Sequence, residues 1–259
     1  MRILLTNDDG INSPGLTMLA KALREDGHRV FVTAPGCNRS GSSHSILFLN
    51  EPCKLEEVDK DTWICSGTPV DCVLVSLLGA IDDIRVLREG TKINIENAPD
   101  LILSGINKGA NLGTDIVYSG TAGAARQGSF FGIPSVALSL VENGGVWYWE
   151  TAIQYITENL SDIMGFWKER CFVNVNFPNI GKKPAALVPS FPSVRYYNDS
   201  IVKFNAPEGG IYCFAKAGKT TAHTESGRAE DGSDWAEVLK GNAALSVVMS
   251  QPVSVSAQG

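Results

Sequence analysis

The chain has 259 residues, 44% of them hydrophobic, so it can bury a substantial core and is not disordered. Acidic residues outnumber basic ones by 28 to 22, and the formal charge of -6 excludes a general DNA- or RNA-binding protein. No apolar stretch reaches the roughly 20 residues of a membrane-spanning helix. We therefore expect a cytoplasmic protein with no membrane partner and no stable nucleic-acid partner.

The chain holds few residues typical of a metal site built from sulfur or imidazole. It has three histidines, none paired at helical spacing, which argues against zinc. No Cys-x-x-Cys pair occurs, and in a chain without an export signal the pattern predicts reduced, buried thiols. The six cysteines stand at positions 37, 53, 65, 72, 171 and 213.

The first 35 residues predict a strand, a helix and a second strand. Residues 3–5 form a continuous apolar run, which is typical of a parallel strand covered on both faces. Ser13 is suited to cap a helix, Pro14 to be its first residue and Gly27 to end it. Residues 30–32 predict the next strand. We expect a βαβ unit with a right-handed crossover.

The next segment predicts short strands and a capped helix. Residues 46–49, 53–55 and 62–64 are short strand-like pieces separated by turns. Thr68 begins a segment with a proline next and an aspartate three residues on, a pattern that favours a helix running through Leu77.

Strands and helices alternate over the middle of the chain. The polar residues 79–98 interrupt them without clear periodicity, and we interpret them as a surface insertion. The alternation predicts an α/β protein with a Rossmann-like, doubly wound, mostly parallel sheet and helices on both faces. The expected strands are 101–103, 135–140 and 172–176, and the expected helices begin near Thr121 and span 149–167.

The composition of the sequence changes after Pro178, where prolines, aromatic residues and turn residues become frequent. Residues 201–204 and 211–214 flank a Pro-Glu-Gly-Gly turn, which is a hairpin signal. A hairpin cannot bury itself alone, so it must lie on the main domain or on another subunit. We therefore divide the chain into a catalytic domain, 1–178, and a C-terminal hairpin and oligomerisation extension, 179–259, and expect a homodimer or homotetramer.

The first candidate site is Asn7-Asp8-Asp9-Gly10, directly after the first strand. Neighbouring side chains of a strand point to opposite faces, so Asp8 and Asp9 can converge only if the strand ends there. The carboxyl ends of the strands are where open α/β sheets bind ligands. Paired carboxylates suit a hard divalent cation, although the same residues would also serve as caps of the following helix.

Two further polar segments follow strands at the same edge. Arg39-Ser40-Gly41 offers a hydroxyl and a cation in a glycine- and serine-rich loop, which on its own resembles an ordinary polar loop. Asn107 follows another strand end. Ser119-Gly120-Thr121 opens a helix of small residues, which favours either a phosphate cradle of backbone amides or close packing of helix on sheet.

Taken together, these segments resemble the survival protein SurE family. The resemblance rests on Asn-Asp-Asp-Gly, Arg39-Ser40-Gly41, the Ser-Gly-Thr-Pro-Val-Asp segment at 66–71, Ser-Gly-Ile-Asn at 104–107 and Tyr-Ser-Gly-Thr at 118–121. The motifs span residues 1 to about 140 in order, and Val-Asn-Val-Asn-Phe-Pro at 173–178 extends them. The resemblance implies a metal-dependent phosphatase that hydrolyses nucleoside 5'- and in some members 3'-monophosphates, and in some members short polyphosphate.

The resemblance also implies a set of site residues. The family's metal ligands match Asp8, Asp9, Ser40 and Asn107, which would hold one divalent ion per subunit, Mg²⁺ or Mn²⁺. We interpret Asp9 as the group that orients or deprotonates water, with Asp8 as a ligand, and Asn12 as a third catalytic residue. Candidate phosphate-binding residues are Asn111, Ser119, Gly120 and Thr121. His44 is a weaker candidate for the acid that protonates the leaving group, since a lone loop histidine is more often a bystander.

Two other classes of function stay open. A non-catalytic nucleotide-binding module would use Asp8 and Asp9 only as caps, and a glycosyltransferase-like domain would turn over a donor sugar. A phosphatase with an aspartyl-phosphate intermediate of the haloacid-dehalogenase type would need Asp-x-Asp after the first strand, which the adjacent aspartates do not provide.

Overall fold

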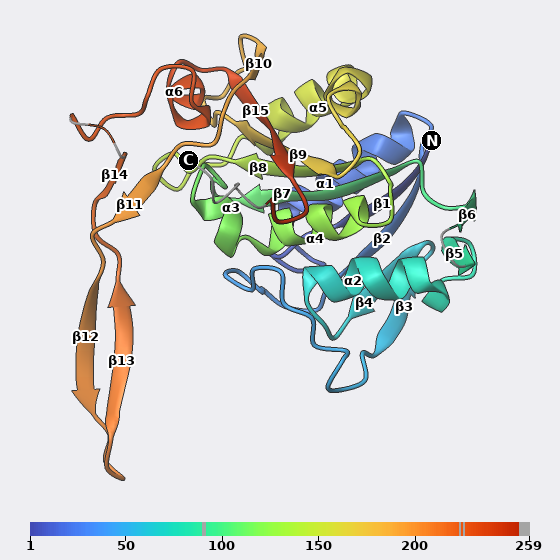
Figure 1. Ribbon diagram of the computed structural model, residues 1–259, viewed down its shortest axis with the longest axis horizontal. Coiled ribbons are helices and arrows are strands. Elements are labelled where there is room, and N and C mark those ends of the chain that lie inside the picture. Colours follow the sequence, from blue (N-terminus) through green and yellow to red (C-terminus); the bar gives the residue numbers. More distant parts are fainter. Residues whose placement is uncertain (90–91, 223, 225, 254–259) are drawn as a thin grey trace, which may run out of the picture.

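The computed structural model describes residues 1–89, 92–222, 224 and 226–253. For residues 85–89 and 92–96 it describes the backbone alone. Nine strands form one central sheet, parallel except for the β3–β4 and β9–β15 pairs (Figure 1). The predicted α/β, doubly wound, mostly parallel sheet is confirmed. Its strands, in spatial order, are β10 (Leu187–Pro189), β15 (Ala243–Met249), β9 (Cys171–Phe177), β8 (Ser135–Leu140), β7 (Leu101–Lys108), β1 (Arg2–Thr6), β2 (Arg29–Pro35), β4 (Thr62–Cys65) and β3 (Leu55–Asp59).

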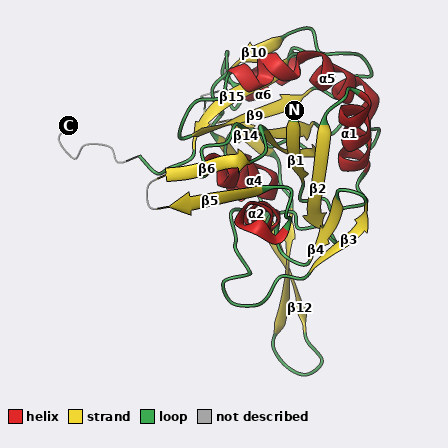
Figure 2. Ribbon diagram, turned by 90° about the vertical axis from the view of Figure 1, so that its right-hand side faces the viewer, coloured by secondary structure: helices red, strands yellow, loops and turns green. Residues whose placement is uncertain are grey.

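Helices cover both faces of the sheet, as predicted (Figure 2). On one face α1 (Pro14–Glu25) and α5 (Trp149–Gly165) pack together and enclose the larger apolar core. On the other face α2 (Pro69–Val75) packs against α4 (Gly120–Ser129) over a second core. In the described part of the chain no helix is both long and apolar enough to cross a bilayer. The short helices are α3 (Asp115–Tyr118) and α6 (Asp234–Leu239).

The predicted βαβ unit comprises β1, α1 and β2. The helix starts at Pro14 as expected, and Gly27 follows its end with φ +82°. The hydroxyl of Ser13, however, does not cap the helix. It accepts a 2.6 Å hydrogen bond from Asn7 Nδ2, so it stabilises the turn after β1 instead.

The helix predicted from Thr68 is present as α2, with a complete capping box. Thr68 Oγ1 accepts from the amide of Asp71, and the Asp71 carboxylate accepts from the amide of Thr68. The same carboxylate accepts the amides of Leu47 and Phe48. The strand predicted at 46–49 is therefore wrong: these amides bind a buried side chain and do not join a sheet ladder.

The polar segment 79–98 has regular structure that its composition did not indicate. A π-helical turn, Ser76–Ala80, continues α2, and β5 (Arg85–Glu89) pairs antiparallel with β6 (Lys92–Asn97). This two-stranded unit is separate from the central sheet.

The C-terminal part both completes the sheet and leaves it. β10 and β15 extend the sheet beyond β9, and α6 packs on β15. Between them β11 (Arg195–Tyr197) pairs with β14 (Thr220–Ala222), and the predicted hairpin, β12 (Ser200–Asn205) with β13 (Ile211–Lys216), projects from the body (Figure 1). We call β12–β13 the arm and β11–β14 its base.

The cysteines match their prediction in part. All six are free thiols, as expected. Cys65, Cys72 and Cys171 are buried, but Cys37 and Cys213 are exposed, so the prediction that the thiols are buried is wrong for these two. Cys37 lies in the loop after β2 and Cys213 on the arm, where no core covers them.

Candidate functional site

The loops after β1, β2 and β7 meet at the carboxyl edge of the sheet. β1 ends at Thr6, and Asn7 closes the next turn through hydrogen bonds with both the amide and the carbonyl of Gly10. Gly10 has φ +101°, and a Cβ there would lie 3.2 Å from the backbone of Cys37. The turn therefore needs a glycine to bring Asp8 and Asp9 beside the loop after β2.

Asp8 is buried and faces the first turn of α4. Thr121 donates to it twice, from Oγ1 to Oδ1 at 2.6 Å and from its amide to Oδ2 at 3.2 Å. Burial raises the pKa of the Asp8 carboxyl, and the hydrogen bonds from Thr121 and Gly120 oppose this rise. The amides of the helix start thus face an anionic side chain of the protein itself.

Asp9 is half-buried and points to the end of β7, where its Oδ2 accepts a 2.8 Å hydrogen bond from the amide of Lys108. Burial raises the pKa of Asp9 and the Lys108 amide lowers it, while the negative charge of Asp8 raises it and the positive charge of Lys108 lowers it. The Lys108 ammonium lies 5.3 Å from the centre of the Trp147 ring.

A cavity of about 260 Å³ opens on Asp8 and brings together residues from all the predicted segments. Asn107 donates its amide nitrogen to the carbonyl of Gly109, which leaves its Oδ1 as the atom available to a ligand. Ser40 is exposed and lines the cavity. The cavity is lined by Asp8, Ser40, Gly41, Asn107, Lys108, Gly109, Ala110, Asn111, Asp115, Tyr118 and Ser119.

Asp9 and Asn12 line a neighbouring cavity of about 330 Å³. Lys108 borders both cavities, and Trp149 lies among the lining residues of the second. Asn12 is exposed. The two acidic residues therefore open on adjoining hollows, Asp8 on one and Asp9 on the other.

The three residues at the start of α4 differ in what they offer. Ser119 caps the helix by accepting from the amide of Ala122, and its side chain lines the first cavity. Gly120 lies against Asp8, where a Cβ would meet the Asp8 side chain at 3.0 Å. The hydroxyl and amide of Thr121 are both bonded to Asp8, so Thr121 acts on the site through that carboxylate.

His44 lies away from both cavities. Its Nε2 hydrogen-bonds Gln127 Oε1 at 2.9 Å, and its Nδ1 is buried with no partner in the described part of the chain. Burial lowers the pKa of the ring. This packed position agrees with the bystander interpretation of His44.

The donors at this edge fit a hard divalent cation. Asp8, Asp9, Ser40 and Asn107 offer only oxygen, which Mg²⁺ and Mn²⁺ prefer. No lysine, arginine or histidine among the described residues forms an ion pair with either carboxylate. Burial disfavours the charged form of both carboxyls, of Asp8 more than of half-buried Asp9, so a bound cation would stabilise the pair. The described residues hold no cluster of three His, Cys, Asp or Glu side chains suited to a metal.

The sequence reasoning missed the residues that support Asn111. Asn174 and Asn176 both donate to its carbonyl, Asn176 accepts from its amide, and Ser139 accepts from its side chain. The two asparagines alternate along the otherwise apolar strand β9, so both point to one face. Polar residues at every second position of a buried strand were the signal that would have revealed them.

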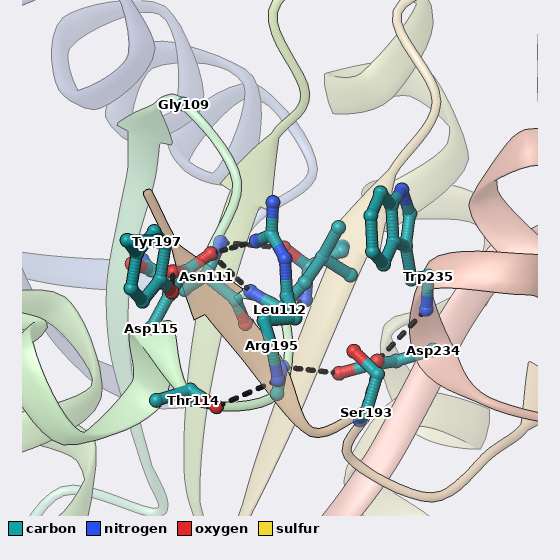
Figure 3. Close-up of polar contacts among 12 residues, drawn as sticks. Gly109, Asn111, Leu112, Thr114, Asp115, Ser193, Arg195, Tyr197, Asp234 and Trp235 are labelled. Atoms are coloured by element: carbon teal, nitrogen blue, oxygen red, sulfur yellow. Dashed lines mark hydrogen bonds and ion pairs between the residues drawn. The ribbon is translucent and has the colours of Figure 1, made fainter. Parts of the chain in front are cut away.

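The reasoning also missed the far wall of the first cavity. Asp115 and Tyr118 line it, and Asp115 is bound by Arg195 and Tyr197, which belong to the base of the arm (Figure 3). About 80 residues separate these partners, so no local pattern connects them.

The fold and the site define a Rossmann-like α/β protein with two adjacent acids, one buried and one half-buried, and neutral oxygen donors at the carboxyl edge of its sheet. Comparison with known proteins agrees with this class. The family model described as "Survival protein SurE" matches residues 3–191. The chain belongs to this family, as its motifs predicted.

The similarity extends to individual relatives. The chain is 41% identical over 182 residues to a protein of Xanthomonas campestris named 5'-nucleotidase SurE, covering 70% of this chain and 64% of the relative. A protein of the same name from Stenotrophomonas maltophilia is 36% identical over 255 residues, covering 96% and 89%. The crystal structure of the SurE protein from Aquifex aeolicus superposes with a TM-score of 0.79 at 32% identity, covering 98% and 95%.

Proposed function

We propose that this chain is a metal-dependent 5'-nucleotidase that hydrolyses nucleoside monophosphates to nucleoside and phosphate. The observation that carries the proposal is the pair of adjacent carboxylates, buried Asp8 and half-buried Asp9, which form no side-chain ion pair among the described residues. Asp8 shares a cavity with Ser40 and Asn107, and Asp9 lines the adjoining cavity. Membership of a family whose relatives carry the name 5'-nucleotidase supports it. Activity on 3'-monophosphates and short polyphosphate belongs to the same proposal.

One divalent ion, Mg²⁺ or Mn²⁺, would be held by Asp8, Asp9, Ser40 and Asn107. Two carboxylates balance its charge, so the edge would no longer repel a phosphate. When bound, such an ion polarises a phosphoryl oxygen and lowers the pKa of water from roughly 16 toward 7.

The protein's own groups would orient the reactants. Asp9, fixed by the Lys108 amide, is the candidate to position the attacking water and accept its proton. Asn111 and Ser119 are candidates to hydrogen-bond phosphoryl oxygens, and Asn12 to do so from the adjoining cavity. The Gly120 amide faces the Asp8 carboxylate and would act on the site through it. Thr121 would contribute by holding Asp8 in place. Asn111 is well suited, because Ser139, Asn174 and Asn176 fix its orientation.

A phosphate-release screen tests the proposed function. Purified chain is incubated with nucleoside 5'- and 3'-monophosphates and short polyphosphate, in EDTA and then with Mg²⁺ or Mn²⁺ added. We expect release only with a divalent ion. A binding module would instead bind AMP in EDTA and release nothing, and a glycosyltransferase-like domain would turn over a donor sugar without hydrolysing phosphomonoesters. Either result would contradict the proposal.

We further propose that residues 179–259 serve assembly through the arm, giving a homodimer or homotetramer. Six large apolar side chains on the arm are exposed, from 38% for Val202 to 60% for Ile211. A two-stranded hairpin of this kind gains stability only by packing on something else. A cytoplasmic location remains a prediction from the sequence.

A further inference from the structure

One wall of the first cavity is a loop that connects β7 to α3. Of the residues that line the cavity, Gly109, Ala110 and Asn111 lie on this loop, and Asp115 begins the helix after it. We call residues 109–115 the wall loop. Of the candidate cation ligands, Asp8 and Ser40 lie on other segments of the chain, and Asn107 stands just before the loop and donates to the carbonyl of Gly109 at its start.

The chain just before the arm is fastened to the back of the wall loop. Asp234, fully buried, accepts hydrogen bonds from the amides of Gly113 at 2.7 Å and Ser193 at 2.9 Å. Gly113 has φ +53°, and a Cβ there would lie 1.7 Å from the carbonyl oxygen of Ser193. The amide of Arg195 donates to Thr114 Oγ1 at 3.0 Å. The wall loop is therefore in direct contact with the chain that leads into the arm base and with the first residue of that base.

Side chains of the arm base complete this fastening at Asp115. Arg195 forms an ion pair with one Asp115 oxygen, and the Tyr197 hydroxyl donates to the other (Figure 3). The amide of Leu112 also donates to Asp115, at 3.3 Å. The guanidinium lies 4.8 Å from the centre of the Trp235 ring, and the two charged side chains are only 13% and 21% exposed. An ion pair this buried holds its groups tightly, and removing one partner leaves the other charge uncompensated.

We propose that Arg195 is a positioning residue for substrate: through Asp115 it holds the wall loop in the shape that receives the nucleotide. The proposal rests on the proposed function and extends it to the base of the arm. Asp8 and Ser40 lie on other segments, and Asn107 is bonded to the end of the wall loop opposite Asp115. Loosening the contacts of Asp115 therefore changes the affinity for the nucleotide and leaves the cation site intact. The base of the arm thereby connects an element suited to assembly with the wall of the catalytic cavity.

The test compares Arg195→Ala with the unaltered full-length chain. We expect the KM for AMP to rise about tenfold, as is typical for the loss of one strong side-chain interaction, and kcat to change by less than about threefold. The affinity for Mn²⁺, measured by electron paramagnetic resonance without nucleotide, should not change. Added guanidinium ion should restore part of the KM, and Arg195→Lys should restore less because ammonium lacks the forked donor geometry. Lys182→Ala removes an exposed positive charge elsewhere and is the matched control.

Several outcomes would overturn the proposal. An unchanged KM in a natively folded Arg195→Ala would do so, as would an equal loss of Mn²⁺ affinity, which would indicate general damage. If Arg195→Ala does not fold, Tyr197→Phe removes one hydrogen bond from Asp115, and an unchanged KM there overturns the proposal. If the unaltered chain releases no phosphate, the proposed function fails. The effect of Arg195→Ala on the affinity for AMP, measured by calorimetry, then tests the positioning role of Arg195. A chain that neither binds nor hydrolyses AMP contradicts both.

Discussion

The central sheet and the arm use similar residues in opposite ways. Every residue of β8 and β9 is buried, whereas every residue of β12 and β13 is exposed, although both pairs carry valine and phenylalanine. The sheet strands lie between two helical layers that the same chain supplies. The residues of the arm contact one another across its two strands, as Phe204 does Phe214 at 5.8 Å between ring centres. Apolar composition makes a core only where the topology brings a second layer to it.

The difference extends to polar groups. At the carboxyl edge of the sheet, buried polar side chains have designated partners, such as Thr121 for Asp8 and Asp71 for three backbone amides. On the arm, by contrast, polar side chains are solvated. The sheet therefore holds a site whose geometry is fixed within one chain, and the arm holds a surface that another copy would complete.

The largest effect should come from removing a charge at the sheet edge. We expect Asp8→Asn or Asp9→Asn to lower phosphate release by more than about a thousandfold, because the cation would lose a charged ligand. The circular dichroism spectrum should remain native, since asparagine has nearly the same shape and no longer carries a buried charge. Asp82→Asn, in an exposed turn, is the control and should keep full activity. Full activity in either site variant would remove the proposed mechanism.

The second prediction compares one phenylalanine from each region. Phe172 on β9 is fully buried and Phe214 on the arm is 59% exposed. Phe172→Ala should lower the free energy of unfolding by about 4 kcal/mol, through lost burial and the cavity left behind. Phe214→Ala should change that of a dilute monomer by less than about 0.5 kcal/mol, and should instead weaken self-association.

Denaturant titration and sedimentation velocity measure these two effects. A Phe214→Ala monomer destabilised as strongly as Phe172→Ala would show that the arm packs within its own chain. A chain that sediments as a monomer at all concentrations would contradict the assembly role of the arm.

Local patterns predicted the parts of the fold that depend on neighbours in sequence. The capping box at Thr68 and the continuous apolar strands around residues 4 and 137 are of this kind, because burial on both faces requires an unbroken apolar run. The strand prediction for residues 46–49 was wrong for a physical reason. Its apolar residues resemble a strand, but its amides bind Asp71, more than 20 residues away.

The candidate site was predictable where it depends on strand ends. Parallel strands bring their carboxyl ends to one edge, so placing Asp8, Ser40 and Asn107 near the ends of three strands sufficed to bring them near one cavity. The strand before Asn107 is longer than predicted, and Asn107 is the penultimate residue of β7. The ion pair between Arg195 and Asp115 was not predictable, because Arg195 lies on a segment about 80 residues later. Which polar side chain meets which across such a distance depends on the path of the C-terminal chain.

The smallest expected effect is on the pH dependence of stability. It compares His44, packed among the loops at the sheet edge, with the solvated side chains of the arm. Burial holds the pKa of His44 below the ordinary value of 6.5, so the folded ring stays neutral where the unfolded ring is protonated. Below pH 6.5 the unfolded state therefore binds more protons, and stability falls as the pH is lowered toward the folded pKa. His44→Gln should lessen this fall in the melting temperature, while measurement near pH 8 isolates the packing change. Identical pH slopes in the two proteins would show that the ring is solvated like a side chain of the arm.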